Sequence, residues 1–301
     1  MKFLSVLLFF ISGSASASVL DSPVIEEHPG SQIYNNDYQR KQVDCNKRRG
    51  AEIFLPILRD DQTPTVVFGH GQALNVTHYE ESFKHLAKKG IAVVFPDYSR
   101  NFFDQNWQRM GRDYVNQVNC ALESEGLNKN LIVFSGHSKG AYVASVAAGL
   151  SHRDDMSVKP EGLVLLNIAG FDSTVVPFIP PAVETTLVFS DQDNVVDKEL
   201  SETLYDLMPS LKKQFILLKS YPEDTNKTSF EAVHMWPLNK PFLLFGGGPI
   251  GPLHYYGLWK WLIAAAEDVK SGGEGSNDFI YGLDAVDKGP IDLKDDIIRS
   301  W

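Results

Sequence analysis

The chain has 301 residues, with 38 acidic side chains against 28 basic ones and a formal net charge of −10. A content of 43% hydrophobic and 22% charged residues is typical of a folded globular protein and excludes a disordered one. The acidic balance argues against a nucleic-acid-binding protein, which needs a basic surface. Two cysteines are too few for a disulfide scaffold or a four-cysteine zinc site, and the sequence indicates neither a metal site nor a cofactor.

Residues 1–17 are predicted to be a signal peptide, which would place the mature chain in the periplasm or outside the cell. Lys2 supplies a positive charge, residues 3–11 form an apolar run too short to span a bilayer, and Ala15-Ser16-Ala17 resembles a cleavage site. Residues 18–301 would then form one secreted domain without a stable membrane anchor. Its last part, 270–301, is predicted to be a Gly- and Asp-rich tail.

An oxidising compartment makes Cys45 and Cys120 a predicted disulfide. Apolar spacing predicts a helix over residues 106–123, and Cys120 lies off its apolar face. A surface thiol in an exported protein is usually paired. The alternative is two separate buried thiols.

From residue 52 onward, short apolar runs rich in β-branched residues alternate with helical patterns. The predicted strands are 52–55, 65–68, 91–95, 131–134, 163–168, 186–189 and 215–218. Helical spacing predicts helices over 79–86, 106–123, 200–207 and 255–266, the first of them opened by a capping box at Thr77 and Glu80. This alternation predicts an α/β fold with a mostly parallel central sheet covered by helices on both faces.

A nucleophile motif follows the strand at 131–134. Gly136-His137-Ser138-Lys139-Gly140 is a G-x-S-x-G sequence that leads into a run of small residues, 141–148. A sharp strand-to-helix turn strains the backbone of the central residue and leaves no room for a side chain at the flanking glycines. Ser138 is therefore predicted to be a nucleophile at the positive end of the helix that follows.

A nucleophilic serine needs a base that an acid orients. The acid is expected in the loop after the strand at 186–189, where Asp193 is favoured over Asp191. The chain order serine, acid, histidine then leaves His234 and His254 as bases. His234 is favoured because it lies in a loop after the last predicted strand, whereas His254 begins a helix.

An anionic intermediate needs two N–H donors. The backbone N–H of Lys139 is one, and Gln72, in the Gly-rich loop after the strand at 65–68, is predicted to supply the other. The segment 169–184 is too short for a large cap domain. Its apolar residues are predicted to form one wall of the acyl pocket, with ordinary core packing as the alternative: Val175, Val176, Phe178 and Ile179.

His70-Gly71, the motif at 136–140, Asp193 and a late histidine, in this order, resemble the α/β-hydrolase superfamily over about residues 50–265. The pattern is similar to compact esterases related to dienelactone hydrolases, polyester hydrolases and platelet-activating-factor acetylhydrolases. The resemblance implies a secreted carboxylic ester hydrolase with a Ser138-His234-Asp193 triad, an acyl-enzyme intermediate and a small-molecule or polymeric ester as substrate. The alternatives are a peptidase or amidase on the same fold, or a degenerate hydrolase fold used for binding.

Overall fold

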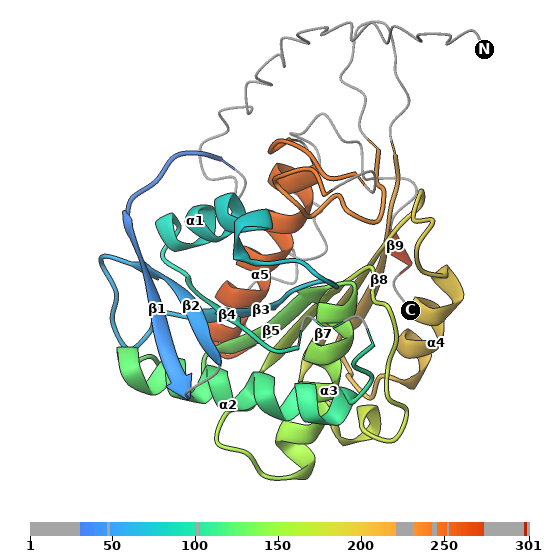
Figure 1. Ribbon diagram of the computed structural model, residues 1–301, viewed down its shortest axis with the longest axis horizontal. Coiled ribbons are helices and arrows are strands. Elements are labelled where there is room, and N and C mark those ends of the chain that lie inside the picture. The colour runs from blue at the N-terminus through green and yellow to red at the C-terminus, as the bar shows by residue number, and fades with distance from the viewer. Residues whose placement is uncertain are drawn as a thin grey trace, which may run out of the picture.

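The fold is built on a nine-stranded sheet (Figure 1). Its strands lie in the order β1-β2-β4-β3-β5-β6-β7-β8-β9. The computed structural model describes residues 31–46, 49–99, 101, 103–220, 231–242, 246–251, 253–273 and 298–299. The predicted signal peptide and most of the predicted tail lie outside the described residues. Within the described ranges, no helix is long and apolar enough to cross a membrane.

The structure confirms the predicted mostly parallel sheet. The strands are β1 (Tyr38–Asn46), β2 (Arg49–Pro56), β3 (Thr65–Gly69), β4 (Ala92–Pro96), β5 (Ile132–His137), β6 (Gly162–Leu166), β7 (Glu184–Ser190), β8 (Lys213–Leu218) and β9 (Ile298–Arg299). From β4 through β3, β5, β6 and β7 to β8, neighbouring strands are parallel. The pairings β1–β2, β2–β4 and β8–β9 are antiparallel.

Helices cover both faces of the sheet, as predicted. They are α1 (Glu80–Lys88), α2 (Trp107–Glu125), α3 (Lys139–Arg153), α4 (Lys198–Leu207) and α5 (Trp259–Lys270). Because strand side chains alternate between faces, Val66 and Phe68 pack in one apolar cluster with α1 and α5, while Val67 packs in another with α2, α3 and α4. The sheet therefore separates two apolar layers.

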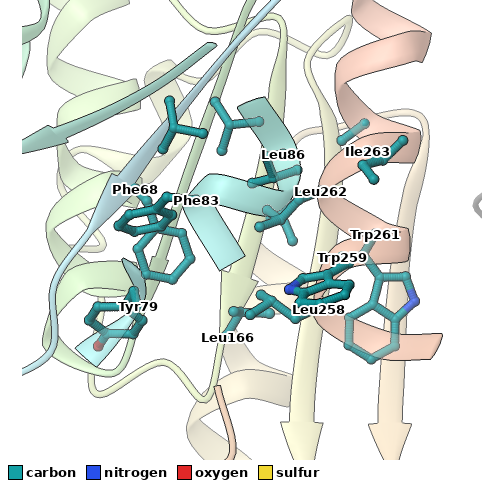
Figure 2. Close-up of a cluster of buried hydrophobic side chains, with 14 of the residues drawn as sticks. Phe68, Tyr79, Phe83, Leu86, Leu166, Leu258, Trp259, Trp261, Leu262 and Ile263 are labelled. Carbon is teal, nitrogen blue, oxygen red and sulfur yellow. The ribbon is translucent and has the colours of Figure 1, made fainter. Parts of the chain in front are cut away.

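The layer between α1 and α5 is rich in aromatic rings (Figure 2). Phe83 and Leu86 of α1 pack in one cluster with Trp259 and Leu262 of α5. The indole Nε1 of Trp259 donates a hydrogen bond of 2.9 Å to Ser82 Oγ, so the one polar atom of this ring is satisfied where it is buried. The contact joins the two helices that cover this face.

The starts of two helices differ from the predictions. The capping box predicted at Thr77 and Glu80 is wrong, because Asn75 caps a short 3-10 turn, η1 (Val76–His78), and α1 begins only at Glu80. Asn75 Oδ1 accepts the Thr77 N–H at 3.1 Å, so the cap lies before this turn. The helix predicted over 255–266 begins with a π-helical turn, η3 (His254–Leu258).

Cys45 of β1 and Cys120 of α2 form a disulfide, which confirms the predicted pair. Their Cα atoms are 5.7 Å apart although 75 residues separate them along the chain. The bond joins an edge strand of the sheet to a helix that covers one of its faces.

Candidate active site

Ser138 lies in the turn between β5 and α3, at the carboxyl edge of the sheet. Its backbone has φ 57° and ψ −123°, a strained conformation for a residue with a side chain. Two hydrogen bonds fix this turn beside β6: Ser138 N–H donates to Leu166 O at 2.9 Å, and Ala169 N–H donates to Ser138 O at 3.3 Å. The strand-to-helix turn predicted from the motif is present, and it sets Ser138 at the start of α3.

The glycines of the motif let α3 start directly against the sheet. A Cβ atom on Gly140 would lie 2.1 Å from the backbone oxygen of Gly69, at the end of β3. A Cβ atom on Gly136 would lie 2.4 Å from the carbonyl carbon of Gly140. Larger residues at either position would push the helix away and move Ser138 with it.

Asp193 and His234 form a buried pair. His234 Nδ1 lies 2.6 Å from Asp193 Oδ2, and the two side chains are 2% and 0% exposed respectively. The other oxygen, Oδ1, accepts the N–H groups of Val195 at 2.8 Å and Val196 at 3.0 Å. These bonds stabilise the carboxylate and aim its free oxygen at the imidazole.

The rival acid, Asp191, has a different contact. Its Oδ1 accepts hydrogen bonds from the N–H and the hydroxyl of Ser220, at 2.8 and 2.7 Å. Ser220 Oγ in turn accepts the N–H of Ala232 at 2.9 Å. Asp191 thus ties the loop after β7 to the loop that carries His234.

The loop of His234 lies at the same edge of the sheet as Ser138. The His234 carbonyl oxygen is 2.8 Å from Nε2 of His137 and 3.1 Å from Nδ2 of Asn167. His137 directly precedes Ser138, and Asn167 directly follows Leu166, which accepts the Ser138 N–H. The structure therefore brings Ser138, His234 and Asp193 together at one edge.

His254, the alternative base, packs near Trp236 and Trp259. It is 3% exposed, at the start of η3, with its ring centroid 6.4 Å from that of Trp236 and 6.3 Å from that of Trp259. Its Nδ1 accepts the N–H of Gly251 at 3.3 Å. Burial lowers the pKa of His254 to about 4, which suits a neutral ring packed among indoles.

The two predicted oxyanion donors belong to segments next to the turn at Ser138. Lys139 is the first residue of α3, where backbone N–H groups point out of the helix. Gln72 follows Gly71 in the loop after β3, and a Cβ atom on Gly71 would lie 3.3 Å from Nδ1 of His137. The loop of Gln72 thus runs beside the residue that precedes Ser138.

The side chain of Lys139 is directed to another loop, a contact that the sequence did not indicate. Its Nζ donates to the carbonyl oxygens of Ser99 at 3.2 Å and Asn101 at 3.3 Å, and lies 5.7 Å from the centroid of the Trp107 ring. Burial lowers the pKa of Lys139. The lysine thereby anchors the segment between β4 and α2 next to the nucleophile turn.

The segment predicted as a pocket wall is not brought to Ser138. Val175, Val176 and Ile179 are buried in the core, and a Cβ atom on Gly149 would lie 2.4 Å from the carbonyl oxygen of Val175. Gly149 lies about 16 Å along α3 from Ser138 at the usual helical rise. Phe178 is 48% exposed, under the guanidinium of Arg153. The alternative, ordinary core packing, describes the three buried residues.

Comparisons with known proteins identify the fold. No family model matches the sequence, and no curated protein matches it. Among solved structures, the chain is similar to an esterase from the fungus Rhizomucor miehei, with a TM-score of 0.58 and 14% identity over 80% of this chain and 86% of the esterase. Within the described residues, the connection from β6 to β7 holds only a single 3-10 turn, η2 (Val176–Phe178). The chain therefore has the α/β-hydrolase fold, and the part of it that the structure describes holds no large cap domain.

Proposed function

We propose that this chain is a secreted serine hydrolase that cleaves carboxylic esters through an acyl-enzyme intermediate. One observation carries the proposal: a serine in a strained strand-to-helix turn shares an edge of the sheet with a buried His234–Asp193 pair at 2.6 Å. Structural networks also contain buried His–Asp pairs, but a strained serine in a strand-to-helix turn is typical of a catalytic nucleophile. The fold's likeness to a fungal esterase supports the choice of ester substrates.

The proposal gives each residue a step. Ser138 Oγ attacks the ester carbonyl while His234 Nε2 takes the proton of the serine hydroxyl. Asp193 accepts a hydrogen bond from Nδ1–H of His234 and stabilises the imidazolium that forms. The N–H groups of Lys139 and Gln72 bind the oxyanion. His234 then gives the proton to the departing alcohol, and water, activated by the same imidazole, releases the acid.

Ser138→Ala tests the nucleophile. The wild type should hydrolyse a short p-nitrophenyl ester and react with a fluorophosphonate, and Ser138→Ala should do neither, since it removes the hydroxyl that both reactions need. A correctly folded wild-type protein without either reaction would contradict the proposal. Faster cleavage of a peptide panel than of esters would favour a peptidase on the same fold.

The two histidines can be tested in the same assay. His234→Ala should lower kcat by about 10³-fold or more, because the serine loses its general base. His254→Gln should retain most of the activity, because His254 packs among tryptophans rather than against Asp193. The opposite pattern would assign the base to His254.

A further inference from the structure

A line of buried side chains behind Ser138 joins the loop of Gln72 to the loop of His234. The N–H of Gly71 donates to the hydroxyl of Tyr79 at 3.2 Å, and this hydroxyl lies 2.9 Å from Nδ1 of His137. Nε2 of His137 lies 2.8 Å from the carbonyl oxygen of His234. Tyr79 and His137 are both 0% exposed, so water does not compete for these bonds.

Each group in this line can have only one role. The His234 carbonyl can only accept, so His137 must carry its proton on Nε2 and donate it. A neutral His137 then presents a bare Nδ1, to which the Tyr79 hydroxyl donates. That hydroxyl in turn accepts the Gly71 N–H. Burial, and the nearby imidazole of His234, hold the pKa of His137 well below its usual range, so the ring stays neutral.

A second donor fixes the same carbonyl from the neighbouring strands. Asn167 Nδ2 donates to His234 O at 3.1 Å. Asn167 Oδ1 accepts the N–H and the hydroxyl of Ser190 at 3.0 and 3.1 Å, at the end of β7 just before the loop of Asp193. The backbone of His234 is thus held both from the nucleophile turn and from the strand that leads to its acid.

We propose that His137 is a positioning residue: supported by Tyr79, it fixes the backbone of His234 relative to Ser138 and to the loop of Gln72. The inference rests on the proposed function, since it concerns where that base is held. The ring of His137 lies 5.0 Å, centroid to centroid, from that of His234, but both nitrogens of His137 are engaged by other groups, the Tyr79 hydroxyl and the His234 carbonyl. The effect of His137 and Tyr79 is to keep the base and the oxyanion donor at a constant separation, and a misplacement of about 1 Å can cost about 10²-fold in rate.

Two amide variants of His137 form a matched test. The side-chain amide nitrogen that His137→Gln introduces can reach the place of Nε2 and donate to His234 O, whereas the shorter side chain of His137→Asn ends near the place of Nδ1. We expect His137→Asn to lower kcat about 10- to 100-fold with KM little changed, because the base is displaced but the substrate surface is not. His137→Gln should restore most of kcat. Tyr79→Phe should give a smaller loss.

Stability separates positioning from a purely structural role. If His137 served folding alone, kcat would stay at the wild-type value in every variant that folds, and only the thermal midpoints would fall. Equal kcat in the wild type, His137→Gln and His137→Asn would therefore overturn the inference. So would an equal loss of kcat in the two amide variants, since only one of them keeps the donor.

Nitrogen-15 NMR of the histidine rings gives a readout that needs no activity. His137 should be the neutral Nε2–H tautomer in the wild type from pH 5 to pH 8, and an Nδ1–H tautomer would overturn the inference even if no variant folds. Failure of the proposed function looks different. If Ser138→Ala still hydrolyses esters, the hydrolase assignment is contradicted. It is also contradicted if the wild type shows the expected tautomer but hydrolyses no ester.

Discussion

At Gly140 the first turn of α3 meets the backbone of β3. The contact involves main-chain atoms on both sides, since a Cβ atom would lie 2.1 Å from Gly69 O and 2.8 Å from His70 N. Neither strand nor helix can give way there without moving Ser138. The strand-to-helix turn at Ser138 therefore requires a glycine at this position. The reason is that there is no room for a Cβ atom, and not that the residue needs a positive φ angle.

Gly140→Ala should destabilise the protein by about 1–3 kcal/mol or more, because the added methyl group overpacks two backbones. Urea unfolding followed by circular dichroism measures the change. Gly248→Ala is the matched control, since a Cβ atom there would meet nothing within 4 Å. Equal unfolding midpoints for the two variants would show that α3 can shift at no cost.

The residue scale also shows what the sequence could and could not predict about the site. Ser138 was predicted from the G-x-S-x-G motif, whose spacing is typical of a strand-to-helix turn. Asp193 and His234 were predicted from the order of the elements along the chain. The Tyr79–His137 and His137–His234 contacts join residues 58 and 97 positions apart, so they leave no local spacing to recognise. The anchoring by Lys139 is hidden for the same reason.

At the scale of elements, β1 and α2 are joined by the Cys45–Cys120 disulfide. β1 is an edge strand of polar sequence, so apolar burial contributes little to holding it against β2. A covalent bond to α2 compensates for this, because α2 itself packs against the sheet through residues such as Met110 and Tyr114.

Removing the disulfide should lower the free energy of unfolding. A bridge that closes a loop of 75 residues contributes about 4 kcal/mol in the chain-entropy model. We expect the variant with both Cys45→Ala and Cys120→Ala to unfold at correspondingly lower denaturant concentration. A reductant should have the same effect on the wild type and none on the variant. An unchanged midpoint in both experiments would contradict the stabilising role.

The strands that are buried on both faces were easier to predict than the exposed edge strand. The parallel strands carry continuous apolar runs because both of their faces are covered, and the structure places them within a few residues of the predicted bounds. β1 was not predicted because its sequence, YQRKQVDCN, is almost wholly polar. For the segment of Val175 the sequence left two alternatives open, because an apolar run has the same pattern in a core and in a pocket wall.

At the scale of the whole molecule, the sheet has two different ends. The carboxyl ends of its parallel strands hold Ser138, Asn167 and Asp193, whereas the amino end of β7 begins with Glu184, which faces Asp268 of α5. Asp268 is 5% exposed, and Lys212 lies against Glu184. Burial and the neighbouring Glu184 raise the pKa of Asp268 to about 7.

This raised pKa predicts a loss of stability with rising pH. Asp268 binds its proton more tightly in the folded protein than in the unfolded one, so its contribution is present below about pH 4 and is lost as pH rises through 7. Asp268→Asn, which stays neutral, should flatten that part of the pH profile of the thermal midpoint and raise the midpoint at pH 8. A wild-type slope that survives in Asp268→Asn would assign it to another group.

The covalent link between β1 and α2 also governs how the protein has to be made. In a cytoplasm kept reducing by glutathione and thioredoxin, the chain would fold with two free thiols. Its edge strand would then be held only by non-covalent contacts, such as the β1–β2 hydrogen bonds and the ion pair of Lys41 with Glu125 of α2. Recombinant protein from such a host would be made in the less stable, reduced form. Air oxidation during purification would then yield a mixture of reduced and disulfide-bonded protein. Export into an oxidising compartment, or refolding with a disulfide-exchange catalyst, supplies the homogeneous protein that quantitative kinetics requires.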